Sequence, residues 1–395
     1  MKVCGRSCET DEVITLTIEA GRITAIRNGM EPEAVGTEVL GGPDVWLSPG
    51  FFDLQVNGYG GFDFNLATWG RENEVANEPE PLLMKLMESG TALVCPTLTT
   101  NSHEAIIKAL EKLVQVLNAN PKLAAAVPGF HLEGPYMSPD DGPRGAHPRE
   151  HVRDPDWEEF QRFQEAAGGR IRLCTLAPER PGALQLIEKL TLSGVVVALG
   201  HTAAEPETIR DAVLAGARLS THLGNGAHSM LRRHPNYIWE QLACDALFAS
   251  IITDGHHLPA SVAKSMARVK GAERLALVSD AVALGGLAPG QYADGRYEVL
   301  PGGKIVTVGT PYLAGAGHLL DVCIANALRF TDLTLAQVIG CVSAVPARII
   351  GLEARKGHLR VGYDADITLF RIPAAGPLAI VATICAGELL YQPRC

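Results

Sequence analysis

The sequence is poor in positive charge. It contains 34 Lys and Arg residues against 44 Asp and Glu residues, which gives a formal net charge of -10. Binding to the phosphate backbone of nucleic acids requires clustered positive charge, so no nucleic acid is expected as a partner. An anionic substrate would therefore have to be held by cations placed locally around its site.

Cysteine pairs and long apolar runs are also lacking. The nine cysteines, from Cys4 to Cys395, are odd in number and show no Cys-x-x-Cys spacing, which excludes a disulfide framework and a thiolate zinc site. The first residues are acidic where a signal peptide would be apolar, and the apolar segment 378–390 is too short to span a bilayer. We expect a cytoplasmic protein without membrane contact.

The chain has 395 residues and is 47% hydrophobic, enough for one large domain and a smaller one. Alternating apolar and polar residues from Val13 to Ile26 predict a β-hairpin, and short β-type runs recur between 357 and 391. We expect a small β-sandwich domain formed from both termini. The expected boundaries are 1–48 and 351–395 for this domain and 49–350 for the domain between them.

The central segment alternates short apolar runs with helix-like stretches, which is typical of βαβ units in a parallel sheet. Eight such runs can be identified. They end near Asn57, Thr97, Glu133, Pro178, His201, His222, Asp254 and Asp280. Eight units predict an α/β fold, a (β/α)₈ TIM-like barrel, in which catalytic residues lie at the C-terminal ends of the strands.

Three of these strand ends carry side chains that bind metals. Glu133, His201 and His222 each follow an apolar run and would meet at the mouth of the barrel. Two nitrogen ligands and one oxygen ligand leave a position open for water, as in catalytic zinc sites. A single histidine at such a position is more often a hydrogen-bonded buried residue, but three equivalent positions favour a metal centre.

Asp280 ends the eighth predicted strand in the segment LALVSDAVALGG. A carboxylate there can accept a proton from water and return it to a leaving nitrogen, as amide hydrolysis requires. An aspartate that caps the next helix is an equally good interpretation of this position alone.

Loops after the strands add further polar groups. The Gly- and Pro-rich loop GPYMSPDDGPRGAHP carries His147, and the segment TDGHHLP carries His256 and His257. The loop after the sixth strand adds His228, Arg232, Arg233 and His234. Such a group of cations and donors suits a sugar phosphate, although about half of these side chains would be expected simply to face solvent.

Seven segments in order resemble the N-acetylglucosamine-6-phosphate deacetylase family of the amidohydrolase superfamily. They are PGFFDLQVNGYGGFDFN, HLEGPYMSPDDGPRGAHP, ALGHTAA, STHLGNGAHSM, TDGHHLP, LVSDAVALGG and LAGAGHLLD. The resemblance covers nearly the whole chain. It implies hydrolysis of the acetamide of N-acetylglucosamine 6-phosphate, with Glu133, His201 and His222 as metal ligands, Asp280 as general base and acid, and His147 polarising the acetyl carbonyl.

The resemblance also implies residues that hold the sugar and its phosphate. These are His257, Asn225, the backbone at Gly226, and the loop 313–317 with Leu313, Ala314 and Gly315. In the family, an arginine after the sixth strand reaches the phosphate across a dimer interface, so a homodimer is expected. Here the segment reads NGAHSMLRRHPNYIW, in which we expect Arg232 or Arg233 to replace that arginine, while His228, His234 and Trp239 leave open a different polar end of the substrate.

A second departure concerns the first strand. Much of the superfamily has a His-x-His pair there that builds a second metal site, whereas this chain has Gln55 and Asn57. Amide side chains are poor ligands beside imidazoles, so we expect one divalent ion per chain. Zinc is favoured, and Fe²⁺, Co²⁺ and Mn²⁺ accept the same ligands.

Other functions stay open at this point. The same chemistry can act on N-acetylgalactosamine 6-phosphate, on an unphosphorylated N-acetyl sugar or on an N-acylamino acid, because fold and ligands do not separate these substrates. A catalytically dead sugar-phosphate sensor on the same barrel is disfavoured by the complete set of catalytic residues. A cyclic amidase is disfavoured by the missing His-x-His pair.

Overall fold

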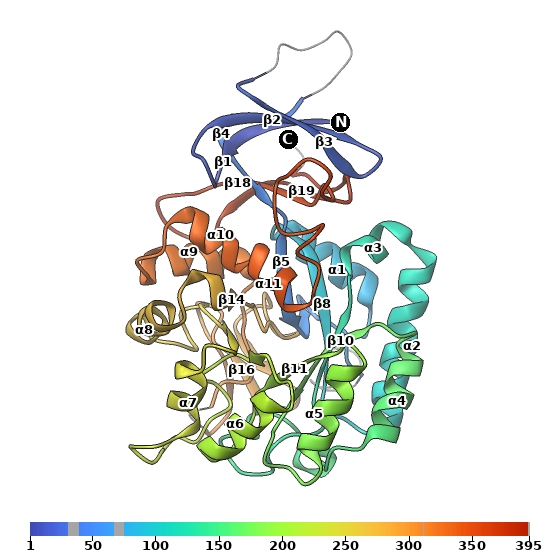
Figure 1. Ribbon diagram of the computed structural model, residues 1–395, viewed down its shortest axis with the longest axis vertical. Coiled ribbons are helices and arrows are strands. Elements are labelled where there is room, and N and C mark those ends of the chain that lie inside the picture. The colour runs from blue at the N-terminus through green and yellow to red at the C-terminus, as the bar shows by residue number, and fades with distance from the viewer. Residues whose placement is uncertain (31–38, 67–74, 311, 394–395) are drawn as a thin grey trace.

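The computed structural model describes residues 1–30, 39–66, 75–310 and 312–393 (Figure 1). Its centre is an eight-stranded parallel sheet in which each strand pairs with the next one along the chain. The strands are β5 (Phe51–Val56), β8 (Thr91–Thr99), β9 (Phe130–Glu133), β10 (Ile171–Leu176), β11 (Val196–Leu199), β12 (Leu219–Ser220), β13 (Phe248–Ile251) and β14 (Leu275–Leu277). The eight predicted strands and the barrel fold are confirmed.

The first and last barrel strands, β5 and β14, meet through a few hydrogen bonds. The amide of Asp280 donates to the carbonyl oxygen of Gln55 (2.8 Å). Below this contact, the buried carboxylate of Asp53 accepts from the amides of Gln55 (3.1 Å) and Ser279 (3.3 Å). The side chain of Asp53 thus bridges β5 and the residues after β14, where the backbone hydrogen bonds between these two strands are few.

Helices cover the outside of the barrel (Figure 1). They are α1 (Pro79–Glu88), α2 (His103–Ala119), α3 (Pro121–Ala126), α4 (Trp157–Ala166), α5 (Ala183–Leu192), α6 (Pro206–Leu214), α7 (Tyr237–Ala243), α8 (Ala260–Lys270), α9 (Leu320–Phe330), α10 (Leu335–Cys341) and α11 (Ala344–Ile349), with 3₁₀ turns at Arg149–His151 and Ala272–Arg274. The longest, α2, is capped by Ser102, whose side chain accepts from the amide of Ala105. None of the helices in the described ranges is long and apolar enough to cross a membrane.

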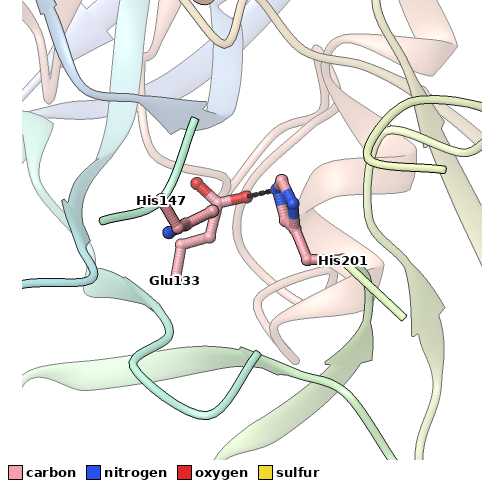
Figure 2. Close-up of side chains that lie close together, drawn as sticks. All are labelled: Glu133, His147 and His201. Carbon is pink, nitrogen blue, oxygen red and sulfur yellow. Dashed lines mark ion pairs between the residues drawn. The ribbon is translucent and has the colours of Figure 1, made fainter. Parts of the chain in front are cut away.

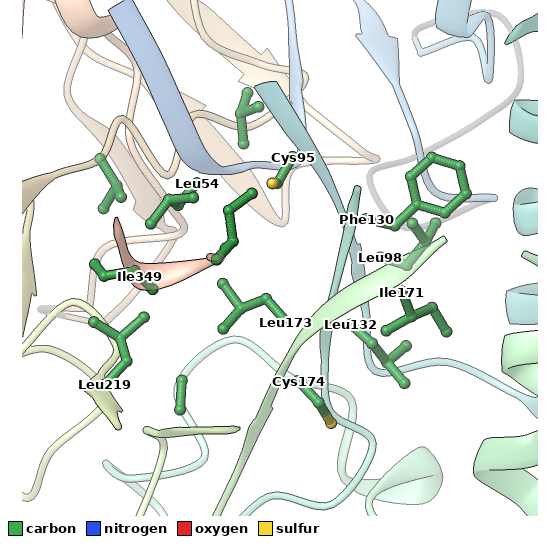
Figure 3. Close-up of a cluster of buried hydrophobic side chains, with 14 of the residues drawn as sticks. Leu54, Cys95, Leu98, Phe130, Leu132, Ile171, Leu173, Cys174, Leu219 and Ile349 are labelled. Carbon is green, nitrogen blue, oxygen red and sulfur yellow. The ribbon is translucent and has the colours of Figure 1, made fainter. Parts of the chain in front are cut away.

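The core between strands and helices is apolar; its largest cluster packs around β5 to β12 (Figure 3), and a second one packs around β13 and β14. Strand residues such as Leu98, Phe130 and Leu173 are at most 1% exposed. Parallel strands in a barrel are covered on both faces, which explains why they read as near-continuous apolar runs in the sequence. Buried polar residues are the exceptions in this frame; some lie within strands, such as Asp53 in β5, and others at strand ends, such as Glu133.

A second, seven-stranded sheet is built from both termini, as predicted. Its order is β20-β19-β18-β4-β1-β2-β3. The strands are β1 (Lys2–Ser7), β2 (Val13–Glu19), β3 (Arg22–Asn28), β4 (Val39–Pro49), β18 (Ile367–Arg371), β19 (Ala379–Cys385) and β20 (Glu388–Tyr391). The predicted N-terminal hairpin is the antiparallel pair β2–β3. The boundaries 1–48, 49–350 and 351–395 stay a proposal for the domain division.

Two small sheets lie in the connections of the barrel and were not predicted. One is the pair β6 (Gly58–Tyr59) and β7 (Phe62–Asp63) after β5. The other, after β14, consists of β15 (Gly290–Tyr292), β16 (Tyr297–Val299) and β17 (Ile305–Thr307). The amide of Ala314 donates to Ile305 (3.1 Å) and that of Ala316 to Asp280 (3.2 Å), so this sheet orders the loop beside Asp280.

Candidate metal centre and active site

Four predicted residues converge at the C-terminal ends of the barrel strands. Glu133 ends β9, while His201, His222 and Asp280 follow β11, β12 and β14. The last three have left-handed backbones, with φ of 50°, 29° and 49°. Each such residue costs on the order of 1 kcal/mol or more, and strain of this kind gathers at functional sites. The sequence does not reveal this shared conformation, because none of the three is a glycine.

Glu133, His201 and His222 bring three ligand atoms to one point. His222 Nε2 lies 3.1 Å from Glu133 Oε1 and 2.9 Å from His201 Nε2, and His201 Nε2 lies 3.4 Å from Glu133 Oε1. Zinc bonds of about 2.0–2.2 Å in a tetrahedron separate neighbouring ligands by about 3.3–3.5 Å, so the three atoms need to move apart by only a few tenths of an ångström to share one small cation. The donor set of two nitrogens and one carboxylate also fits.

The carbonyl of Pro143 orients His201. His201 Nδ1 donates to this oxygen at 2.9 Å, which leaves the lone pair of a neutral ring on Nε2, facing Glu133 and His222. His222 Nδ1 is buried and has no hydrogen-bond partner among the described residues. Both imidazoles therefore present Nε2 to the same point.

His147 lies beside the same cluster (Figure 2). Ligand atoms of Glu133, His147 and His201 all lie within 4.8 Å of one another, and the rings of His147 and His201 meet edge to face at 4.2 Å between centroids. The three atoms of Glu133, His201 and His222 lie 2.9–3.4 Å apart. The shorter distances favour His222 as the third ligand and leave His147 as a neighbour.

The charges in the cluster are coupled. Burial favours the neutral forms, yet hydrogen bonds with His201 and His222 hold the pKa of Glu133 well below its usual value. The bond with Glu133 in turn raises the pKa of His222 against burial. Burial and the nearby His201 lower the pKa of His147 to about 3, so His147 is a neutral imidazole at pH 7. Burial and the Glu133 carboxylate raise the pKa of Asp280 to about 6.

The two amides that replace a His-x-His pair contact both carboxylates. Gln55 Nε2 donates to Glu133 Oε1 (2.7 Å) and to Asp280 Oδ1 (3.1 Å), and Asn57 Nδ2 donates to Asp280 Oδ1 (2.9 Å). Gln55 thereby links Glu133 to Asp280. The sequence showed that Gln55 and Asn57 stand where other family members have metal-binding histidines. It did not show that these amides donate hydrogen bonds to Glu133 and Asp280.

Gly226, predicted from the resemblance, packs against His201. A Cβ atom there would lie 2.7 Å from His201 Nδ1, at a φ of +55°. Gly145 approaches the same ring from another side, where a Cβ would lie 3.0 Å from Cε1. Next to this ring is a pocket lined by, among others, Thr221, Asn225, Gly226, Ala227 and Tyr237. Only glycine leaves room for the imidazole at these two positions.

The remaining predicted residues lie in three different settings. His257 is anchored by Asp254, whose Oδ2 lies 2.8 Å from Nδ1, and Leu313, Ala314 and Gly315 belong to the loop paired with Asp280. Asn225 uses its side chain to donate to the carbonyl of His222 (3.1 Å), which closes its own turn. Arg232 and Arg233 are exposed, and within the described ranges no contact joins either guanidinium to the cluster.

The chain matches the family model described as the amidohydrolase family over residues 46–390. It is 35% identical to the N-acetylglucosamine-6-phosphate deacetylase of Bos taurus over 88% of this chain and 83% of the relative. The enzyme of the same name from Bacillus subtilis is 30% identical over 95% and 92%. N-acetylgalactosamine-6-phosphate deacetylase of Escherichia coli O157:H7 is 31% identical over 81% and 82%.

Solved structures are similar over the full length. An N-acetyl-D-glucosamine-6-phosphate deacetylase mutant from Mycobacterium smegmatis, in complex with N-acetyl-D-glucosamine-6-phosphate, has a TM-score of 0.85 at 28% identity over 99% of both chains. The enzyme from Pasteurella multocida has a TM-score of 0.82 at 25% identity over 98% of this chain and 99% of its own. These similarities confirm the family resemblance of the sequence motifs.

Proposed function

The chain belongs to the amidohydrolase family, and from this premise we propose that it hydrolyses the acetamide of N-acetylglucosamine 6-phosphate, releasing glucosamine 6-phosphate and acetate. The observation that carries the proposal is the convergence of Glu133, His201 and His222 on one point, with Asp280 linked to them through Gln55. This arrangement supplies metal ligands and a proton acceptor together, as hydrolysis of a linear amide requires.

The family is metal-dependent, and the cluster fits one divalent ion. Glu133, His201 and His222 would hold it, with Zn²⁺ favoured and Fe²⁺, Co²⁺ or Mn²⁺ compatible with the same ligands. Bound there, the ion would lower the pKa of a water molecule and polarise a carbonyl oxygen. Gln55 and Asn57 occupy the place of a second site with donors that point at Glu133 and Asp280, which supports a single ion.

Asp280 is the proposed general base and acid. Its Oδ1 accepts from Gln55 and Asn57, so the second carboxylate oxygen is left to take a proton from the attacking water. Attack on the acetyl carbon produces a tetrahedral centre whose nitrogen must gain a proton before the C–N bond breaks. Asp280 returns the proton to that nitrogen.

His147 is the proposed donor to the acetyl oxygen. Its Nδ1 lies 2.8 Å from Thr100 Oγ1. With the hydroxyl donating to Nδ1, the proton of the neutral ring sits on Nε2 and can be donated to the developing oxyanion. One such donor typically contributes about 3 kcal/mol. The sugar would be held by His257, Asn225, the Gly226 backbone and the loop 313–315.

Steady-state kinetics with three substrates test the proposal. The purified protein, supplied with Zn²⁺, should deacetylate N-acetylglucosamine 6-phosphate with a higher kcat/KM than N-acetylgalactosamine 6-phosphate or free N-acetylglucosamine. A preference for the galactosamine derivative would assign the function of the Escherichia coli relative instead. No acetate release from any of the three would contradict the proposed function.

A homodimer in the cytoplasm is part of the same proposal. Support comes from the family resemblance, in which an arginine after the sixth strand crosses a dimer interface. Light scattering coupled to size exclusion gives the mass in solution. A mass near 42.0 kDa, that of one chain, would contradict the dimer.

A further inference from the structure

His256 lies next to His257 in the loop after β13, and the proposed reaction gives it no part. One carboxylate holds both residues, because the amides of His256 and His257 each donate to Asp254 Oδ1 (2.9 Å). The two rings then separate. His257 Nδ1 lies against Asp254 Oδ2, whereas His256 Nε2 reaches the carbonyl oxygen of Gly302, in the turn between β16 and β17 (2.9 Å).

A second imidazole reaches the same oxygen. His318, just before α9, also has its Nε2 2.9 Å from the carbonyl oxygen of Gly302. The rings of His256 and His318 stack at 5.5 Å between centroids, with 20° between their planes. A carbonyl oxygen only accepts, so both rings carry a proton on Nε2 and use the two lone pairs of that oxygen. We call His256, His318 and this carbonyl group the histidine bridge.

The turn that carries Gly302 is fixed on the loop beside Asp280. A Cβ atom at Gly317 would lie 1.9 Å from the carbonyl oxygen of Gly303, and one at Gly303 would lie 2.7 Å from the ring of His318. The two backbones are therefore in direct contact. Since the amide of Ala316 donates to the carbonyl of Asp280 (3.2 Å), the turn and the loop 313–318 are attached to the end of the eighth strand.

The base of the His257 loop is held separately, by α9. Thr253 Oγ1 donates to the carbonyl of Cys323 (2.8 Å), and Asn326 Nδ2 donates to the carbonyl of Thr253 (2.9 Å). These bonds fix the backbone just after β13. The histidine bridge adds a tie at the tip of the loop, where His257 lies.

We propose that His256 and His318 are positioning residues, which keep the loop of His257 at a fixed spacing from the loop 313–317 beside Asp280. This inference rests on the proposed function, in which these two loops hold the sugar. The bridge would order both loops before substrate arrives. Without it, only a fraction of the molecules would have both loops in place, and KM would rise by the inverse of that fraction. The metal ligands and Asp280 would be unaffected, so kcat would change less.

The first test compares two replacements of His256. His256→Phe keeps a ring that can stack but removes the donor, so KM for N-acetylglucosamine 6-phosphate should rise about fivefold or more, with kcat and metal content within about twofold of wild type. His256→Gln retains an N–H group that can reach Gly302 and should restore most of the wild-type KM. Equal losses in kcat and metal content, or an unchanged KM in His256→Phe, would overturn the proposal.

The second test asks whether the two rings act together. His318→Phe should also raise KM, and the double variant should be no worse than His256→Phe, because the two donors serve one bridge. Effects that multiply would show two independent contacts and overturn the bridge. His358→Phe is the matched control, since that ring packs on Tyr363 (6.1 Å), whose carbonyl accepts from Ile23 of the terminal sheet. An equal rise in KM for this control would also count against the proposal.

Hydrogen exchange of the metal-loaded protein without substrate reads the bridge itself. Amides at 255–258 and 300–303 should exchange faster in His256→Phe than in wild type, and unchanged exchange would contradict the bridge. Both rings are partly exposed, so the variants are expected to fold. Should His256→Phe fail to fold, His256→Ala gives the same comparison without a larger ring. A wild-type protein that releases no acetate refutes the proposed function instead, while the exchange experiment still decides whether the bridge holds the two loops.

Discussion

Replacement of Asp280 by asparagine should remove the proposed proton acceptor while leaving the fold of the site unchanged. Asp280 Oδ1 accepts from Gln55 Nε2 (3.1 Å) and Asn57 Nδ2 (2.9 Å), and an amide oxygen can accept both bonds. The variant also has the same shape and loses a negative charge close to Glu133. We therefore expect Asp280→Asn to fold, to retain its metal and to bind substrate, while the second atom of the group can no longer accept a proton.

The expected loss is in kcat. A positioned general base and acid contributes about 10²–10⁴-fold, which corresponds to about 3–5 kcal/mol at 1.36 kcal/mol per factor of ten. The assay measures acetate release at saturating N-acetylglucosamine 6-phosphate, together with metal content by elemental analysis and the midpoint of thermal unfolding. KM should change little, because Asp280 acts on the water and the leaving nitrogen rather than on the sugar.

Asp53→Asn is the matched control. Asp53 is a buried aspartate of the same barrel whose carboxylate accepts backbone amides at the junction of β5 and β14, below the mouth. Its replacement should alter stability and leave kcat within about threefold of wild type. A kcat for Asp280→Asn close to wild type would refute its role as base. An equal loss in both variants would point to barrel distortion.

Elemental analysis should find about one divalent ion per chain, and chelation should abolish activity until Zn²⁺ or Fe²⁺ is returned; two ions both required for turnover would contradict the single site. His201→Ala and His222→Ala should each purify without metal, and full occupancy in either would show the ligand set to be wrong. Gly226→Ala should weaken metal affinity in chelator competition, since its Cβ would lie 2.7 Å from His201 Nδ1. Gly271→Ala, also at positive φ but with open space around it, should not; equal effects would assign the loss to backbone strain alone. Burial raises the pKa of Asp63 to about 7, so the folded state binds more protons than the unfolded state and wild-type stability should fall between pH 4 and pH 7. Burial also raises the pKa of Asp53 to about 7, so in urea unfolding Asp63→Asn should show a smaller decline than wild type rather than none, and should exceed wild type at pH 8. Parallel curves would show that Asp63 ionises normally.

The barrel and its catalytic strand ends could be predicted from the sequence because they depend on local patterns. Apolar runs that are buried on both faces are short and contiguous, and several end in a polar residue such as Glu133, His201 or Asp280. Parallel strands place all their carboxyl ends on one side, so residues far apart in the chain are known to converge. The terminal sheet was predicted from the alternation in the hairpin β2–β3 in the same way.

The finer chemistry of the site depends on contacts that no local pattern encodes. Gln55 joins Glu133 and Asp280, which lie 78 and 225 positions away, so its donor role follows only from the closed barrel. Residue type likewise did not show that Arg232 and Arg233 are exposed, because burial of a guanidinium depends on which loops pack over it. The hydrophobic pattern thus determined where the strands end. Tertiary packing decided which side chains at those ends form hydrogen bonds, interact through their charges or can bind the same metal ion.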